Sequence, residues 1–218
     1  MLITRTIAAA RAWHKSYEGG LPKRHGFARP CDMDTTATLA ARYSRGAVIL
    51  HWLIALLIAF NFVAAWISED MPKEQAMQVM ANHKAVGITV LLLTVVRIVW
   101  RLTHRPPPLA DSLAAWEVAL SKVVHFLFYV LMLGIPLAGW AMHSAASGGQ
   151  PVSLFGIVNF PGLPFAQNKD LAHTFGGAHE AQATLLLVLL AIHVAGALKH
   201  RFVDRDANAL ARMSLRKG

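Results

Sequence analysis

Residues 179–198 read HEAQATLLLVLLAIHVAGAL, and this stretch decides the fold. It is apolar on every side of a helix between Leu185 and Ile192, and it carries two histidines, His179 and His193. A run of about 20 apolar residues, with a rise of about 1.5 Å each, crosses the roughly 30 Å hydrocarbon core of a bilayer. Because no polar face is present to meet water, the stretch predicts a membrane-spanning helix and not a helix of a soluble bundle.

Three further runs have the same character, and they cover residues 46–66, 83–102 and 123–142. Gly134 and Pro136 interrupt the third run, but helices within a membrane tolerate both residue types. Together the four runs predict an all-α fold, a four-helix transmembrane bundle within residues 42–214. The composition agrees, because 55% of the 218 residues are hydrophobic and 15% are charged, against about 25% charged in soluble proteins.

The positive charge of the chain marks one side of the membrane. The net charge is +9, from 21 Lys and Arg against 12 Asp and Glu. Basic residues gather before the first run, between the second and third, and after the fourth, whereas the opposite loops hold only Lys73, Lys84 and Lys169. The positive-inside rule therefore predicts that both termini are cytoplasmic. The basicity requires no nucleic-acid partner, and the basic tail at 215–218 is expected to meet anionic lipid headgroups.

Residues 1–41 differ from the rest of the chain. They are basic and contain no apolar run of the length that a secretory signal peptide needs. Two interpretations stay open: a disordered basic arm on the cytoplasmic face, or an artefact of start-site assignment in which translation begins at Met33 and not at Met1.

The eleven histidines are the candidate ligands for a cofactor. The single cysteine, Cys31, excludes an iron–sulfur site with four thiolates and a Cys-x-x-Cys-His haem attachment. His51 and His193 lie at matching depths near the cytoplasmic ends of their runs, and His83 and His179 match near the outer starts of theirs. Because His179 and His193 are 14 residues apart, they lie on nearly one helix face, separated by about 21 Å.

This arrangement predicts two stacked b-type haems, one held by the pair His51/His193 and one by the pair His83/His179. Two imidazole ligands leave the iron no open position, which favours electron transfer over oxygen binding. A zinc site or a proton relay usually employs carboxylates, and none lies in the apolar interior of the four runs. Both alternatives are therefore weaker than haem binding.

His125 competes with these ligands, because it lies at about the depth of His51 and His193. It could replace one of them, donate to a haem propionate or line a quinone pocket. The other six histidines lie at or beyond the ends of the runs, and we expect them to be solvated or interfacial and not to bind iron: His14, His25, His104, His143, His173 and His200.

Arg97 lies 14 residues after His83 and therefore on nearly the same helix face, at the depth of the His51/His193 pair. An arginine at the bilayer centre costs about 2.5–3.5 kcal/mol, but near the interface its side chain can reach water. Such snorkelling is one interpretation. The one we prefer is an ion pair between Arg97 and a propionate of the inner haem, with Arg101 one turn further out.

Several short motifs are shared with a known family: Tyr43-Ser44-Arg45, His51-Trp52, Asn82 to Gly87, Val96 to Arg101, Arg105 to Pro108, Pro136 to Trp140, His179-Glu180 and His193 to His200. Together they resemble the bacterial cytochrome b561 family over residues 42 to 214. The chain departs from the family pattern at Asp206 to Leu210, which lacks the glycine that often follows the acidic residue. This departure affects the tail and no ligand.

The resemblance implies a diheme cytochrome of the bacterial inner membrane that passes electrons between an outer donor and the quinone pool, with iron ligands at His51, His83, His179 and His193. Some members oxidise superoxide and reduce ubiquinone, whereas related diheme subunits anchor hydrogenases or other dehydrogenases. Two functions stay open: a quinone-linked oxidoreductase, or an anchor and electron conduit within a larger complex. The outer lysines either attract an anionic donor such as superoxide or are solvated loop charges.

Overall fold

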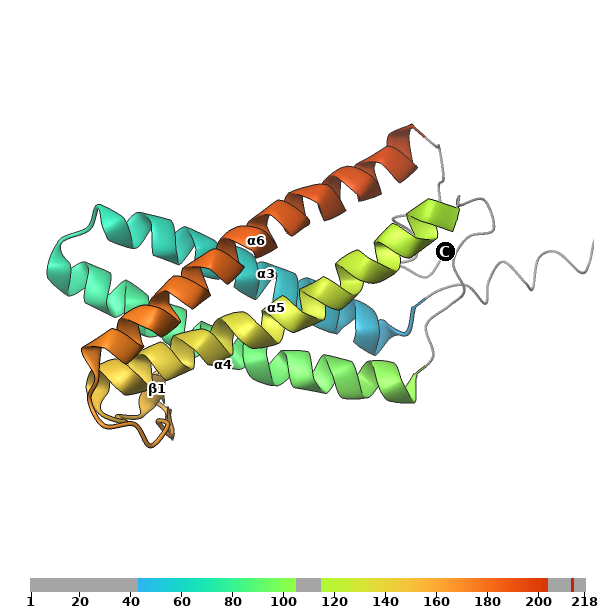
Figure 1. The fold of residues 1–218 in the computed structure, drawn as a ribbon. Helices are drawn as coiled ribbons and strands as arrows, with labels where there is room; N and C mark the ends of the chain where they lie inside the picture. Colours follow the sequence, from blue (N-terminus) through green and yellow to red (C-terminus); the bar gives the residue numbers. More distant parts are fainter. Residues whose placement is uncertain (1–42, 105–114, 204–212, 214–218) are drawn as a thin grey trace, which may run out of the picture. The chain divides into compact units, whose positions relative to one another are not determined.

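The computed structural model describes residues 43–104, 115–203 and 213. The basic arm at 1–41 and the tail at 215–218 lie outside the described residues. The described part contains four long helices and one two-stranded hairpin (Figure 1), in the order α3 (Arg45–Glu69), α4 (Lys73–Thr103), α5 (Ala115–Ser147), β1 (Val152–Leu154), β2 (Val158–Phe160) and α6 (Lys169–Phe202).

The four helices run alternately in opposite directions (Figure 1). The α3–α4 turn and the β1–β2 hairpin lie at one end of the bundle, here called the hairpin end, and α3 begins and α6 finishes at the opposite end. The most extensive contacts join α5 to α6 and α3 to α4, and α4 also packs on α5. All four helices are long and apolar enough to cross a membrane. The predicted four-helix transmembrane bundle is confirmed.

The packing of the bundle suits lipid better than water. Ile54, Val86, Val90 and Met132 form one small buried cluster, and a second cluster joins α5 to α6. Large apolar side chains are exposed on every helix, among them Leu56, Val99, Phe126 and Val188. Exposed apolar surface of this extent marks an interaction site in a soluble protein, whereas a membrane protein presents it to the lipid chains.

The helices extend past the predicted spans at the hairpin end. Helix α4 begins at Lys73 and α6 begins at Lys169, each ten residues before the predicted start of the span. His83 and His179 therefore lie well inside their helices and not at the starts. Hydropathy detects only the residues that suit lipid, whereas the polar turns at 169–178 continue as helix, with Asn168 capping it by accepting from the Leu171 N–H at 2.9 Å.

The segment after α5 folds back along the helix that precedes it. The Trp140 indole N–H donates to the Pro161 carbonyl at 2.9 Å, and the Ser144 hydroxyl accepts from the Leu163 N–H at 3.0 Å. Gly148 and Gly149 turn the chain out of α5 with φ of 70° and 80°, a region that residues with a Cβ rarely adopt. These contacts bring the loop against the hairpin end, where it covers side chains of α5.

Candidate functional site

Two pairs of histidines face one another inside the bundle, at two levels. The ring centres of His51 on α3 and His193 on α6 are 6.4 Å apart, and those of His83 on α4 and His179 on α6 are 6.1 Å apart. The structure brings together the residues that the depth argument paired. Their binding to iron remains a prediction.

The pair near the hairpin end is oriented by backbone carbonyls. His83 Nδ1 donates to the Asn61 carbonyl at 3.2 Å, and His179 Nδ1 donates to the Ile135 carbonyl at 2.8 Å. Because a carbonyl can only accept, this assigns the proton to Nδ1 and leaves Nε2 of each ring with a free lone pair. Metal-binding histidines typically have such a partner on the nitrogen that does not face the metal.

Gly139 on α5 has no side chain and so leaves space for the imidazole of His179. A Cβ at this position would lie 3.1 Å from His179 Nδ1, closer than an ordinary contact. Gly139 lies one turn beyond Ile135, the residue whose carbonyl receives the His179 proton. Gly139 was not predicted from the sequence. A glycine one helical turn after Ile135 was the signal that could have found it.

A cavity of about 660 Å³ surrounds the His83/His179 pair. This volume lies within the range of about 300–1,000 Å³ that is usual for small-molecule sites. Two buried polar atoms of residues that line it, Asn61 Oδ1 and His143 Nε2, have no hydrogen-bond partner among the described residues. Buried polar atoms are nearly always paired, so these two indicate a polar group that belongs in the cavity.

His143 corrects one expectation. The sequence placed it among the solvated or interfacial histidines, but its Nε2 is buried. The reason is the folded-back loop, whose residues Gln150 and Pro151 lie against the imidazole. The position of His143 after an apolar run gave no sign of this cover, because it depends on residues further along the chain.

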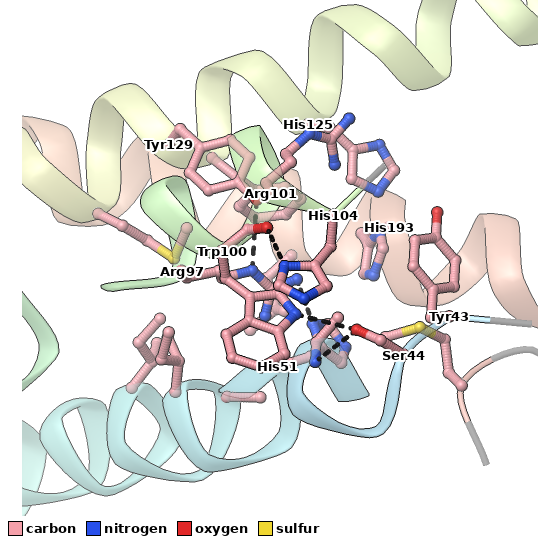
Figure 2. A pocket seen from close by; sticks show the side chains of 18 of the residues that line it. Tyr43, Ser44, His51, Arg97, Trp100, Arg101, His104, His125, Tyr129 and His193 are labelled. Carbon is pink, nitrogen blue, oxygen red and sulfur yellow. Dashed lines mark hydrogen bonds between the residues drawn. The ribbon is translucent and has the colours of Figure 1, made fainter. Parts of the chain in front are cut away.

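Figure 2 shows the smaller cavity, of about 230 Å³, where the His51/His193 pair lies. Arg97 Nη2 is 3.3 Å from His51 Nδ1, and Arg97 Nε donates to the Tyr129 hydroxyl at 3.4 Å. A guanidinium can only donate, so His51 Nδ1 accepts here. This proton arrangement is the opposite of that at His83 and His179.

His125 lies beside the same pair, as its depth in the sequence predicted (Figure 2). Its ring centre is 5.7 Å from that of His193, and its Nδ1 donates to the Ser121 carbonyl at 2.6 Å. His125 thus has both the neighbour and the backbone partner that a ligand needs, so geometry alone leaves it in competition with His51. The guanidinium of Arg101 lies 5.8 Å over the Tyr129 ring at the same cavity.

The spacing of both pairs fits a metal held between two imidazoles. A metal–imidazole bond is about 2 Å long and a ring nitrogen lies about 1 Å from the ring centre, so two rings on opposite sides of one metal have centres about 6 Å apart. Within residues 43–104, 115–203 and 213, no group of three or more His, Cys, Asp or Glu could hold a metal ion. Each pair would supply two ligands, which suits a haem iron because the porphyrin supplies its other four ligands.

A four-helix transmembrane bundle with facing histidines in its interior is the architecture of a membrane-bound b-type cytochrome. The profile of the prokaryotic cytochrome b561 family matches residues 42–214, and the chain belongs to this family. Membership establishes membrane electron transfer with b-type haem, in a multi-pass protein of the bacterial inner membrane.

The match extends over nearly the whole length of several relatives. The chain is 27% identical to "Cytochrome b561 homolog 1" of Escherichia coli (strain K12), over 81% of this chain and 99% of the relative. It is 28% identical to the "Probable superoxide oxidase CybB" of Yersinia pestis, over 81% and 98%. It is 27% identical to "Cytochrome b562" of Cereibacter sphaeroides, over 78% and 94%.

Proposed function

We propose that the protein carries electrons across the membrane through two bis-histidine b haems, between a donor at the hairpin end and quinone at the opposite end. The observation that carries this proposal is the presence of two facing histidine pairs, 6.1 and 6.4 Å apart, joined through one helix. Superoxide is the donor and ubiquinone the acceptor in the form of the proposal that we favour. A relative is named a probable superoxide oxidase, which supports this choice.

The chain's own residues would hold and orient each group. When bound, a haem with two imidazole ligands supplies reversible one-electron transfer, because no iron position is open to substrate. His83 and His179 present Nε2 while their Nδ1 protons are held by carbonyls of α3 and α5. All four histidines are half-buried between the helices, and α6 carries one histidine of each pair and so fixes the distance between the two levels.

We assign the quinone site to the smaller cavity because of the polar side chains that line it. Arg101 and Tyr129 line it and carry N–H and O–H groups that can donate hydrogen bonds to a quinone oxygen. His125 faces the same space, and its Nε2 is left for a hydrogen bond to the quinone because its Nδ1 donates to the Ser121 carbonyl.

The donor end carries charges of both signs. Lys84, Glu69 and Glu180 line the larger cavity, and Lys73 and Lys169 are exposed at the starts of α4 and α6. For an anionic donor, lysines near this opening would raise the encounter rate, and added salt would screen the attraction. Such electrostatic attraction changes the rate at which the donor reaches the protein and leaves the haem content unchanged.

The experiment is haem reduction by superoxide with the protein in lipid nanodiscs. We expect two b haems per chain, reduction of both by superoxide, reoxidation by added ubiquinone, and a rate that falls as salt is added. The double variant K73Q/K169Q should slow reduction, whereas Lys122→Gln at the opposite end is the matched control. If superoxide leaves the haems oxidised, the donor assignment is wrong. If reduced haem is not reoxidised by ubiquinone, the acceptor assignment is wrong.

One observation favours the alternative, an anchor and electron conduit for a larger dehydrogenase or hydrogenase. Residues 144–168 carry no charge, and Phe155 and Ile157 at the hairpin tip are 53% and 84% exposed. Such a tip offers a docking surface to a protein partner. Purification in mild detergent separates the two functions: a dehydrogenase bound in equal amounts, and released by Ile157→Ser, would support the conduit.

A further inference from the structure

Two basic side chains meet at the larger cavity without an acidic partner. His143 on α5 and Lys84 on α4 both line it. His143 Nε2 is buried and unpartnered. Lys84 forms no ion pair with any acidic residue in the part of the chain that the structure describes. A buried imidazole nitrogen with no hydrogen-bond partner is costly, and so is a lysine at the same cavity with no counter-charge, unless a group brought by a ligand meets both.

The acidic residues at the same cavity do not supply that anion. Glu69 and Glu180 line it as well, yet the ion pair found among the described residues joins Lys199 to Glu117 at the opposite end of the bundle. The two glutamates therefore leave His143 Nε2 without a partner. A carboxylate brought by a ligand would give this nitrogen its hydrogen bond and offset the positive charge of Lys84.

The position of His143 points to one carboxylate in particular. It lies four residues beyond Gly139 on α5, hence on the same helix face and one turn closer to the hairpin end. A Cβ added at Gly139 would lie 3.1 Å from His179 Nδ1. A group held between His83 and His179 that carries carboxylates on its edge can reach His143 from there.

We infer that His143 and Lys84 form the carboxylate-binding site for a propionate of the haem held by His83 and His179. The inference rests on the proposed function, because it requires that haem to be present. Beside the carboxylate, the imidazole of His143 is held in its protonated form, with Nε2 donating. Both residues are positioning residues, since they act on the haem edge and not on the iron.

The test uses the full-length protein in detergent or nanodiscs, with redox titration and haem transfer to apomyoglobin as readouts. His143→Gln and Lys84→Gln should each lower the midpoint potential of one of the two haems, because a nearby positive charge disfavours the ferric state. Each should also release that haem about tenfold faster, the scale on which partners beyond the direct ligands affect a bound metal. Lys84→Arg should keep the wild-type values, since it keeps the charge.

His173→Gln is the matched control, because His173 is exposed on α6 near the same end of the bundle and does not line the cavity. Wild-type potentials and haem release in the His143 and Lys84 variants would overturn the inference. The inference would also be overturned if the His143 and Lys84 variants changed only the rate of haem reduction by superoxide, because the anion that these residues bind would then be the soluble donor and not a propionate. A wild-type protein with no haem at the His83/His179 level would instead overturn the proposed function.

Discussion

Arg97 is the residue whose present contacts agree least with a bound haem. Its guanidinium donates towards His51 Nδ1 at 3.3 Å, which requires the imidazole proton to be on Nε2. A histidine that binds iron through Nε2 carries its proton on Nδ1, so two donors would then face each other. A propionate carboxylate in this cavity would accept from Arg97 and relieve the conflict. The ion pair expected from the sequence thus gains a physical reason and stays a prediction.

Replacing Arg97 by leucine should therefore weaken the haem at the His51/His193 level. We expect about tenfold faster loss of that haem and a lower midpoint potential, because a positive charge beside the propionate is removed. Arg97→Lys keeps the charge and should retain most of the potential while losing the forked hydrogen bonding. Redox titration with haem quantitation measures both effects. An unchanged potential and haem content in the leucine variant would show that Arg97 only reaches towards water.

At the scale of elements, the loop after α5 forms part of the wall of the larger cavity. Trp140 lies seven residues before the end of α5, and its indole ties Pro161 to the side of that helix. The ring of Trp140 also packs edge-on against Phe160 of β2, with centres 5.1 Å apart. The hairpin is therefore fastened to the helix at two points, and this holds Val152 of β1 in the cavity wall.

Trp140→Phe should loosen the hairpin without disturbing the bundle. A hydrogen bond of this kind contributes about 1 kcal/mol, which corresponds to roughly a fivefold rise in the population of the open loop. Limited proteolysis of residues 148–168 in nanodiscs measures that population. Trp116→Phe is the control, because Trp116 is 64% exposed at the start of α5. Equal cleavage rates in the wild type and both variants would contradict this role for Trp140.

The spans, the histidine pairs and the positions of Arg97 and His125 beside one pair could be predicted from the sequence, but the surroundings of the His83/His179 pair could not. Spans follow from local hydropathy, and the pairs follow from depth and helical periodicity, both of which are properties of short stretches. The burial of His143 depends on contacts such as Trp140 with Pro161, which are 21 residues apart. The extension of α4 to Lys73 was missed because its first turns are polar. Gly139 matters only through His179, on another helix.

At the scale of the whole molecule, the charge distribution predicts the direction of insertion. Basic residues such as Arg45, Arg101 and Lys199 lie at the end of the bundle opposite the hairpin, which should therefore be cytoplasmic. A fluorescent reporter fused after Gly218 should fluoresce in the cytoplasm, and alkaline phosphatase fused there should be inactive. Alkaline phosphatase inserted at Gly156 in the hairpin tip should be active. The reverse pattern would invert the donor and acceptor sides proposed above.

The central claim is that each of two haems depends on its own pair of histidines. The most direct measurement is haem quantitation, with reduced-minus-oxidised optical spectra, for the wild type and for single alanine variants. We predict two b haems in the wild type, loss of about one in His51→Ala and in His179→Ala, and retention of both in His125→Ala and His173→Ala. The account is contradicted if His51→Ala and His179→Ala both keep the full haem content, or if His125→Ala loses a haem while His51→Ala does not.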